Sequence, residues 1–423
     1  MHLKKTFPIE DKSAFVQMAL VWANGFRHFC YLNGNNSPYA YDAFSEILAV
    51  GNAPATELSE EPLNEFSELF EAKKDFFGFL SYELLSDKKT LGSKGSFFSP
   101  ETIIRFLNSE TIEIESIKEP NDIFKFIIKA NNKGGIFHKK IQFQARLNKE
   151  EYVSTIEKLK QHINRGDIYQ LNFCIDFEAK EAIIDPILFY QKLNQKSPMP
   201  FSGLLKLNEK YIICASPERY LKRINTKVIS QPMKGTAPRN SDPIIDQNNL
   251  KELINSTKER AENTMIVDLV RNDLSRFCKS GTVKVEHLCE IYSFDPVHQM
   301  VSTVVGTLEK NAKPRDIFAD TFPMGSMTGA PKIRAMELIE QYEAIPRGAF
   351  SGAMGYIKPN GNFDFNVLIR SVFYDAQQHT LSYNVGSGIT AMSDSESEYE
   401  ECMLKASTIQ HVLSNYSENI FSN

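Results

Sequence analysis

Apolar residues recur along the chain at two spacings, and each spacing predicts one kind of element. Intervals of three and four residues are typical of helices with one buried face. They mark helices at 12–21, 58–70, 148–165 and 331–344. Short apolar runs bounded by turn residues are typical of strands, and they mark strands at 76–82, 143–147, 211–214, 352–357 and 363–374. The chain is therefore expected to mix helices and strands from its N-terminal third onward.

Two features predict a division of the chain near residue 148. The stretch 131–135 is rich in asparagine and glycine and has the composition of a turn or linker. The helix that follows has its own start signal, because Asn148 can cap it and Glu150 and Glu151 lie in its first turn. We therefore expect an N-terminal α+β region at 1–148 and a second region at 149–423.

The composition excludes several classes of protein. With 423 residues, 42% of them hydrophobic and 24% charged, the chain can bury a large globular core. Its net charge of −5 argues against binding to nucleic acid or to a membrane surface. No apolar run approaches the roughly 18 residues of a transmembrane helix. No apolar stretch follows Lys4 and Lys5, as a signal peptide would require.

The cysteines add a prediction about the compartment. Their spacing includes no Cys-x-x-Cys pair and no zinc-binding pattern. They are Cys30, Cys174, Cys214, Cys278, Cys289 and Cys402. We expect them to be reduced and mostly buried, as in a cytoplasmic protein.

Two Glu-x-x-Glu segments could present paired carboxylates on helices. Glu259 and Glu262 lie three residues apart within helical spacing, so both leave the same helix face. Glu398 and Glu401 repeat this spacing near the C-terminus, and Lys405 follows four residues later. Two such faces opposed across a cleft would form an all-oxygen site for a hard divalent cation such as Mg²⁺. The alternative is that each segment is an ordinary solvated helix face.

Two charged residues lie in predicted turns, where functional groups are common. Glu218 comes directly after an apolar strand. Lys234 lies between Pro232 and Pro238, and the adjacent Gly235 would let a ligand approach the backbone closely. A solvated turn lysine is the alternative interpretation of Lys234.

Several later positions are also candidates. His298 is a lone histidine, for which a core or turn role is the alternative. The Gly-rich segment 322–332 leads into a helix, whose N-terminus would suit an anion. Arg370 lies in an apolar run, so it is either salt-bridged or binds a carboxylate. Gly386 and Gly388 are expected to end a strand and to expose backbone N–H groups.

Six motifs in a fixed order contain most of these candidates. They are Ser-Pro-Glu-Arg (216–219), Pro-Met-Lys-Gly-Thr (232–236), Glu-Arg-Ala-Glu-Asn-x-Met-x-Val-Asp-Leu-x-Arg-Asn-Asp (259–273), Gly-Ser-Met-Thr-Gly-Ala-Pro-Lys (325–332), Gly-Ser-Gly-Ile (386–389) and Glu-x-x-Glu-x-x-x-Lys (398–405). This set resembles the chorismate-binding enzymes, which include the large subunits of anthranilate synthase and aminodeoxychorismate synthase and the isochorismate and salicylate synthases. The resemblance runs from about 150 to 413. It implies an α+β fold in which large antiparallel β-sheets pack face to face with helices on the outside, and it makes 149–423 the chorismate-binding catalytic domain.

The resemblance also implies a role for each candidate residue. The Mg²⁺ ligands would be Glu262 and Glu401 directly, and Glu259 and Glu398 through water. The substrate-binding residues would be Gly235, Thr236, His298 and Thr328 around the ring, Tyr356 and Arg370 at the pyruvyl carboxylate, and Gly386, Gly388 and Lys405 in the remaining anion site. The catalytic residues would be Lys234 and Glu218, with Glu218 as the general acid that protonates the departing ring hydroxyl.

Two positions separate the members of the family. Enzymes that add water carry a lysine base where this chain has Gln170. Anthranilate enzymes usually carry alanine at the position of Lys234, whereas aminodeoxychorismate synthases carry lysine, whose amine would attack the ring before ammonia displaces it. The resemblance therefore implies Mg²⁺-dependent amination of chorismate to 4-amino-4-deoxychorismate, on the route to p-aminobenzoate and folate.

The source of ammonia and two other functions stay open. The sequence holds no Gly-x-Cys-x-Gly glutaminase motif, so ammonia is expected from a separate glutamine amidotransferase subunit or from solution. One alternative function is that of anthranilate synthase, which would eliminate pyruvate; another is that of a catalytically silent binding or regulatory homologue. Relatives hold tryptophan near the N-terminal third. The segment 30–34 lacks their Leu-Leu-Glu-Ser signature, which leaves tryptophan binding undecided.

Overall fold

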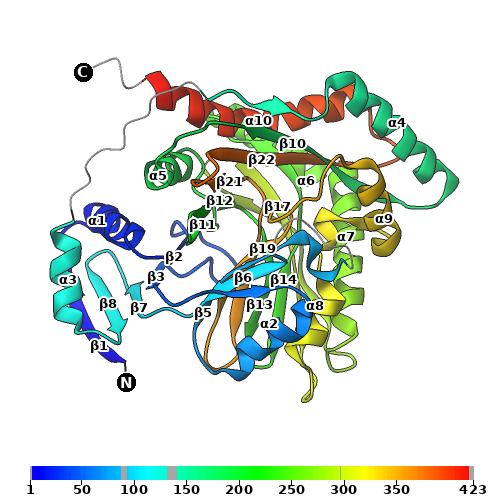
Figure 1. Cartoon of the computed structure of the whole chain (residues 1–423). Coiled ribbons are helices and arrows are strands. Elements are labelled where there is room, and N and C mark those ends of the chain that lie inside the picture. The colour runs from blue at the N-terminus through cyan, green and yellow to red at the C-terminus, as the bar shows by residue number, and fades with distance from the viewer. Residues whose placement is uncertain (1, 87–92, 131–140, 296, 419–423) are drawn as a thin grey trace.

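The computed structural model describes residues 2–86, 93–130, 141–295 and 297–418, and two large antiparallel sheets dominate this part of the chain (Figure 1). The first sheet has the spatial order β1 (Leu3–Pro8), β8 (Thr111–Ser116), β7 (Thr102–Phe106), β3 (Ile47–Gly51), β2 (His28–Asn33), β11 (Phe201–Leu207), β12 (Lys210–Ser216), β21 (Ser371–Asp375), β22 (Thr380–Ile389), β10 (Gln170–Ala179) and β18 (Gly329–Ala330), with β9 (Gln144–Ala145) beside β10. The second has the order β15 (Met233–Pro238), β17 (Val297–Thr307), β14 (Lys227–Gln231), β13 (Arg219–Ile224), β20 (Phe363–Val367), β19 (Ala353–Ile357), β5 (Phe76–Leu80), β6 (Gly95–Phe98) and β4 (Thr56–Leu58), with β16 (Lys284–Ser293) beside β17.

Helices lie around the two sheets (Figure 1). The α-helices are α1 (Lys12–Asn24), α2 (Pro62–Glu71), α3 (Pro120–Ile128), α4 (Lys149–Arg165), α5 (Pro186–Lys196), α6 (Pro243–Asn255), α7 (Thr257–Ser275), α8 (Pro314–Thr321), α9 (Lys332–Tyr342) and α10 (Ser395–Glu418), and the 3₁₀ turns are η1 (Tyr82–Leu85) and η2 (Gly325–Met327). In the described residues, no helix combines the length and the apolar character needed to cross a membrane.

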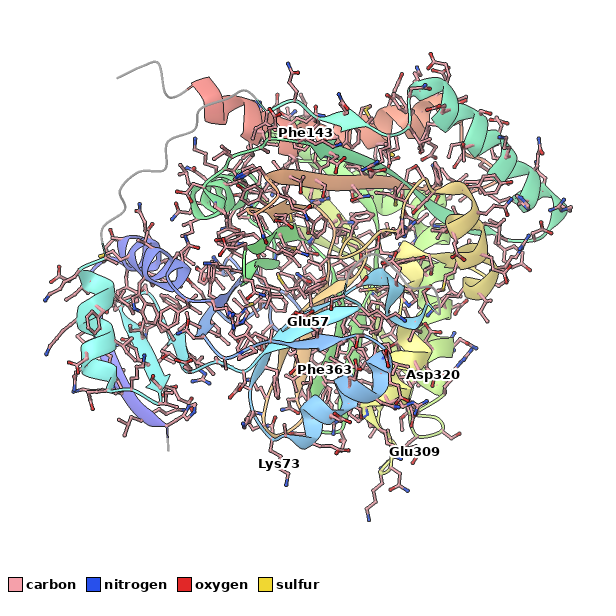
Figure 2. The ribbon with its side chains drawn as sticks, viewed as in Figure 1. Glu57, Lys73, Phe143, Glu309, Asp320 and Phe363 are labelled. Carbon is pink, nitrogen blue, oxygen red and sulfur yellow. The ribbon has the colours of Figure 1, made fainter. Side chains whose placement is uncertain are left out.

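The sheets pack face to face around a shared apolar core, which confirms the predicted fold class. Leu204 and Ile213 of the first sheet belong to the same core as Val301 and Met354 of the second. The outer face of the second sheet forms another core with α2, α7 and α8. In Figure 2, Phe363 of this outer core lies inside the molecule, and it is only 1% exposed. This burial removes apolar area from water at both faces of the second sheet, which stabilises the fold.

The start of α4 shows how a local sequence signal fixes an element. The Asn148 side chain accepts a hydrogen bond from the Glu151 backbone N–H at 2.9 Å, and the Glu151 carboxylate accepts one from the Asn148 N–H at 3.0 Å. This reciprocal capping box satisfies two backbone donors. Gly166 ends the helix in the left-handed conformation, with φ 86°. The predicted helix is confirmed at both ends.

Strands from both sides of residue 148 share each sheet. In the first sheet β2 pairs with β11, and in the second β5 pairs with β19. The division into 1–148 and 149–423 stays a prediction. The predicted linker at 131–135 lies outside the described residues.

Several predicted element bounds are wrong. The helix expected from residue 58 begins at Pro62, because Leu58 pairs with Gly95 in a short strand and Pro62 is suited to a first helical turn. The strand predicted at 143–147 is reduced to Gln144–Ala145. The strand expected to run to residue 82 ends at Leu80 and continues as η1. The helix predicted at 331–344 spans Lys332–Tyr342, with Pro331 at the N-cap.

The largest correction concerns the run 363–374. The sequence predicts one strand, whereas the structure has β20 in the second sheet and β21 in the first. The chain crosses between the sheets just before Ser371, and Arg370 at this crossing has a left-handed φ of 50°. Buried apolar residues continue on both sides of Arg370, from Phe363, Phe365 and Val367 to Val372 and Tyr374, so the pattern contains no sign of the break.

Candidate active site

Glu218 is a buried acid between β12 and β13. Its side chain belongs to a residue only 3% exposed, and Ser326 Oγ donates a hydrogen bond of 2.7 Å to Glu218 Oε1. Burial raises the pKa of Glu218 to about 7, although the Ser326 hydrogen bond and the charge of Lys234 act in the opposite direction. A carboxyl with this pKa can hold and release a proton near neutral pH.

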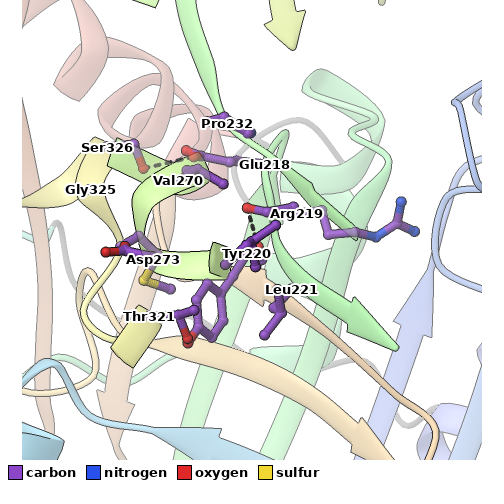
Figure 3. Close-up of a pocket in the computed structure, with 13 residues that line it drawn as sticks. Glu218, Arg219, Tyr220, Leu221, Pro232, Val270, Asp273, Thr321, Gly325 and Ser326 are labelled. Carbon is purple, nitrogen blue, oxygen red and sulfur yellow. Dashed lines mark hydrogen bonds between the residues drawn. The ribbon is translucent and has the colours of Figure 1, made fainter. Parts of the chain in front are cut away.

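A small pocket adjoins Glu218 and lies beneath α7 (Figure 3). Asp273 lies at its wall and forms an ion pair of 2.6 Å with Lys332 Nζ. The lining residues are Glu218, Arg219, Tyr220, Leu221, Ser230, Pro232, Val270, Asp273, Leu274, Thr321, Met324, Gly325 and Ser326. The acid therefore lines a cavity although it is almost fully buried.

Lys234 lies in strand β15, not in the turn that the sequence predicts. A Cβ atom built on Gly388 would lie 2.7 Å from Lys234 Nζ and 3.0 Å from Gln170 Nε2. Glycine at 388 is thus required for the amine to reach this position. The Lys234 charge acts on Glu218, and it acts on Glu262 as well. The amine is therefore within electrostatic range of the buried acid and of Glu262.

The four glutamates of the two Glu-x-x-Glu segments lie on α7 and α10, as predicted. Burial raises the pKa of Glu262, and the negative charges of Glu259 and Glu398 raise it further. Glu262 Oε1 is buried and has no hydrogen-bond partner among the described residues. An acidic cluster with an unsatisfied buried oxygen has the chemistry that a hard cation requires.

These glutamates are not arranged as a complete metal site. Throughout the described ranges, no group of three or more His, Cys, Asp or Glu side chains is placed to hold a metal ion. Glu401 is 49% exposed and forms an ion pair of 2.6 Å with Lys405, whose Nζ also donates to Gly386 O at 2.8 Å. Burial acts to raise the pKa of Glu401, but the charges of Lys405 and Lys234 outweigh it and lower the pKa.

Arg370 is a partly buried cation without a carboxylate partner in the part of the chain that the structure describes. Its Nη1 lies 3.8 Å from Met199 Sδ. Burial lowers the pKa of its guanidinium to about 10. Among the described residues, then, Arg370 has no internal salt bridge, which favours the interpretation that it binds an external carboxylate.

Gly386 and Gly388 lie in the last four residues of β22, which ends at Ile389, so the predicted strand end is confirmed. They pair with Cys174 and Asn172 of β10. On the other side, the pairing with β21 reaches only from Thr380 to Tyr383. The glycines therefore have β10 on one side and lie beyond the end of β21 on the other.

The polar side chains predicted around the ring pocket are engaged with the protein itself. His298 is 2% exposed, and its ring nitrogens contact Ser293 Oγ at 2.8 Å and Asp246 Oδ1 at 3.1 Å. Thr236 Oγ1 donates to Gln299 Oε1 at 2.9 Å. These contacts agree with the alternative of a hydrogen-bonded core histidine.

The remaining predicted residues are buried or closely packed. Thr328 Oγ1 donates to Met324 O at 3.0 Å. Tyr356 is buried between the sheets, with its ring centroid 5.9 Å from that of Phe77. Gly235 has φ 87°, and a Cβ there would lie 3.1 Å from Glu259 Oε2. Gly235 thus brings the Lys234 strand against the start of α7.

The structure adds functional candidates that the sequence predictions did not assign. Ser326 binds Glu218, and it lies inside one of the six motifs, which was the available signal. Gln170 is 1% exposed, and its Oε1 has no hydrogen-bond partner within the described residues. Arg347 Nη1 donates to Met327 O at 2.6 Å, which holds the segment containing Ser326 in place. Arg347 also forms an ion pair of 2.5 Å with Glu343, four residues earlier in the chain.

The sequence profile of the chorismate binding enzyme family matches residues 24–411. The chain belongs to this family. Aminodeoxychorismate synthase component 1 of Salmonella typhimurium is 38% identical to this chorismate-binding enzyme over 273 residues, which is 64% of the chain and 60% of the relative. The corresponding protein of Escherichia coli is 38% identical over 267 residues, which is 63% of the chain and 58% of that relative. Anthranilate synthase component 1 of Haloferax volcanii is 38% identical over 256 residues, which is 60% of the chain and 49% of that relative. The chain thus spans about three fifths or less of these relatives.

Solved structures show the same fold. Anthranilate synthase component I from Streptococcus pneumoniae TIGR4 superposes with a TM-score of 0.76 at 23% identity, covering 88% of this chain and 93% of that one. The menaquinone-specific isochorismate synthase MenF of Escherichia coli superposes with a TM-score of 0.78 at 18% identity, covering 98% and 95%. At these identities the superpositions establish the fold of this chorismate-binding enzyme and leave its reaction to be argued from the site.

Proposed function

We propose that this chorismate-binding enzyme is the large component of an aminodeoxychorismate synthase, which aminates chorismate to 4-amino-4-deoxychorismate with ammonia. The observation that carries the proposal is the position of the Lys234 amine beside Gly388, within electrostatic range of the buried acid Glu218. A lysine and a protonated acid at one site suit the replacement of a hydroxyl by an amine. The aminodeoxychorismate synthase relatives support this choice.

The reaction is balanced by these two side chains and ammonia. The Lys234 amine attacks the ring and forms a C–N bond, while the ring C–O bond breaks and Glu218 gives its proton to the leaving hydroxyl, which departs as water. Ammonia then forms the second C–N bond, the bond to Lys234 breaks, and the released proton returns to Glu218. The pKa of about 7 suits Glu218 to both directions of proton transfer.

Chorismate carries two carboxylates, and the site offers two places for them. The Arg370 guanidinium would bind the pyruvyl carboxylate in two-pronged fashion. A Mg²⁺ ion held by Glu262 and Glu401 directly, and by Glu259 and Glu398 through water, would supply the positive charge for the ring carboxylate. The unsatisfied buried oxygen of Glu262 supports this donor set.

Ammonia would come from a separate glutamine amidotransferase subunit. The sequence contains no Gly-x-Cys-x-Gly motif that could hydrolyse glutamine. The isolated chain should therefore use ammonium salts but not glutamine, and an added glutaminase subunit should confer glutamine dependence.

The second candidate is anthranilate synthase component 1, because the Haloferax volcanii relative is also 38% identical. The two functions differ in their products, since only anthranilate formation eliminates pyruvate.

One assay separates the functions. The purified chain is incubated with chorismate, Mg²⁺ and ammonium chloride, and the products are resolved by HPLC. We expect aminodeoxychorismate from wild type and its loss in Lys234→Ala, whereas Lys284→Ala, which removes an exposed strand lysine, should behave as wild type. Anthranilate as the main product would support the second candidate, and no turnover would indicate a catalytically silent homologue.

A further inference from the structure

Arg219 directly follows Glu218 but points to the opposite side of the strand (Figure 3). Its side chain is fully buried. Nε donates to Asp364 Oδ1 at 2.9 Å, and Nη2 donates to Asp364 Oδ2 at 3.1 Å. The guanidinium carbon lies 4.6 Å from the ring centroid of Phe201 and 5.9 Å from that of Tyr39. A forked ion pair with aromatic contacts allows a single orientation of this arginine.

Three consecutive backbone carbonyls of the N-terminal third complete the surroundings of Arg219. Its Nη1 lies 3.4 Å from Ala40 O, and its Nη2 lies 3.5 Å from Tyr41 O and donates to Asp42 O. Lys222 Nζ also donates to Tyr41 O, at 2.7 Å. Tyr41 and Asp42 have φ values of 62° and 57°, in the left-handed region that non-glycine residues seldom adopt. Side chains of β13 thus hold the segment 40–42 in an unusual backbone conformation.

Gln231 connects this arrangement to the strand that carries Lys234. Its Oε1 accepts a hydrogen bond from Arg219 Nη1, and its Nε2 donates to Ala40 O at 3.0 Å and to Thr303 Oγ1 at 3.2 Å. Gln231 is also the partner of Arg219 across β13 and β14. Only two residues separate Gln231 from Lys234 in the chain. One network therefore reaches both the neighbour of Glu218 and the strand leading to Lys234.

The regular strand ladder does not fix the spacing between Glu218 and Lys234. The pairing of β13 with β14 shifts register between Arg219 and Lys222. The pairing of β15 with β17 shifts register between Met233 and Thr236. Both irregularities lie next to a proposed catalytic residue, where bulges re-aim side chains and loosen the pairing. Contacts outside the ladder can therefore add to the pairing of Arg219 with Gln231 in setting the two side chains relative to each other.

We propose that residues 40–42 form a backbone clamp that fixes the distance between Glu218 and Lys234, with Arg219 and Gln231 as positioning residues. This inference rests on the proposed function, because it is in the amination that Glu218 and Lys234 act in the same step. The clamp gives the N-terminal third, which carries none of the predicted catalytic residues, a direct part in the geometry of the reaction.

The test compares Gln231→Met with Thr303→Val in the full chain. Gln231→Met removes the hydrogen bond that Gln231 accepts from Arg219 and the one that it donates to Ala40 O. Thr303→Val removes only the hydrogen bond between Gln231 and Thr303. The measurements are kcat at saturating chorismate and ammonium, the Kd of chorismate without ammonia, and the melting temperature. We expect kcat of Gln231→Met to fall about 10- to 100-fold, since a misplacement of about 1 Å can cost 100-fold, while its Kd stays near wild type and Thr303→Val keeps the wild-type kcat.

Three results would overturn the clamp. They are a folded Gln231→Met with wild-type kcat, an equal loss of kcat in Thr303→Val, and a loss in Gln231→Met that appears only in the Kd of chorismate. If Gln231→Met does not fold, Lys222→Met decides, because it removes the donor to Tyr41 O and should lower kcat without changing the Kd; unchanged kcat there overturns the clamp. A wild type that does not aminate chorismate overturns the proposed function and the clamp together, whereas an active wild type with an unaffected variant overturns the clamp alone.

Discussion

The two ends of the candidate site differ in how far the protein itself satisfies their carboxylates. At one end Glu218 is 3% exposed and accepts a hydrogen bond from Ser326. At the other end Glu401 is 49% exposed and paired with Lys405, while Glu262 keeps a buried oxygen without a partner in the described residues. The acid end is organised in advance, whereas the glutamate end would be completed by the proposed Mg²⁺. Preorganisation matters most where bonds form and break, because groups that are already in place cost no reorganisation free energy in the transition state.

Removing the organised acid should have the largest effect. In Glu218→Gln, the proton donor for the leaving hydroxyl is lost, so we expect amination to fall by about 10²- to 10⁴-fold, the usual contribution of a general acid. Steady-state kinetics would measure this loss, and Glu209→Gln, an exposed glutamate, is the control. If the amination rate of Glu218→Gln were within a few-fold of that of wild type, Glu218 would not be the general acid.

Arg370 should determine substrate affinity more than stability. In Arg370→Met, the two-pronged contact to a carboxylate is lost, so we expect the Kd of chorismate to rise about 10- to 150-fold, as for hydrogen bonds to charged groups of about 1.5–3 kcal/mol. The melting temperature should not fall through a lost ion pair, because the described residues give Arg370 none. Isothermal titration calorimetry would measure the affinity, with the exposed Arg334→Met as the control. An unchanged Kd would show that Arg370 does not bind the substrate.

Lys405, which forms an ion pair with Glu401, would compete with the proposed Mg²⁺ for this carboxylate. We expect Lys405→Met to tighten Mg²⁺ binding about twofold to fivefold, which corresponds to the free energy that a half-exposed ion pair usually contributes. Glu401→Gln should weaken Mg²⁺ binding, and titration of Mg²⁺ without chorismate would measure both. Weaker Mg²⁺ binding in Lys405→Met would contradict the idea that Lys405 competes with Mg²⁺ for Glu401.

The smallest effect should be a shift in the pH profile. A general acid acts while protonated, so activity should decline as pH rises through the pKa of Glu218, about 7. The Ser326 hydrogen bond lowers this pKa. Ser326→Ala should therefore raise the pKa of Glu218 and move the decline in kcat to higher pH. Activity that instead rises with pH through this range would show that Glu218 works in its ionised form.

The sequence predicts most of the candidate residues but not their local geometry. Lys234, Gly388 and Glu218 belong to motifs that are far apart in the chain, and the structure brings them together. The setting of Lys234 in a strand could not be predicted, because prolines on both sides are as compatible with an irregular edge strand as with a turn. Periodicity reports which positions are buried and does not report which sheet buries them. For this reason the apolar run around Arg370 hides the crossing between sheets.

The contacts of Arg219 lie further beyond sequence-based prediction. Its carbonyl partners at Ala40 to Asp42 precede it by more than 170 positions. Any residue type can supply a backbone carbonyl, so the residue types at 40–42 do not indicate that these carbonyls accept hydrogen bonds from Arg219. Only the tertiary structure reveals that the N-terminal third contacts the neighbour of Glu218.

The most direct test of the central claim is the mass of the intact protein after incubation with chorismate and Mg²⁺ in the absence of ammonia. The account predicts a covalent adduct of chorismate less one water on wild type, located on the peptide that contains Lys234 and absent from Lys234→Ala. Added ammonium should release the adduct as aminodeoxychorismate. Amination by Lys234→Ala at the wild-type rate, or anthranilate as the main product of wild type, would contradict the account.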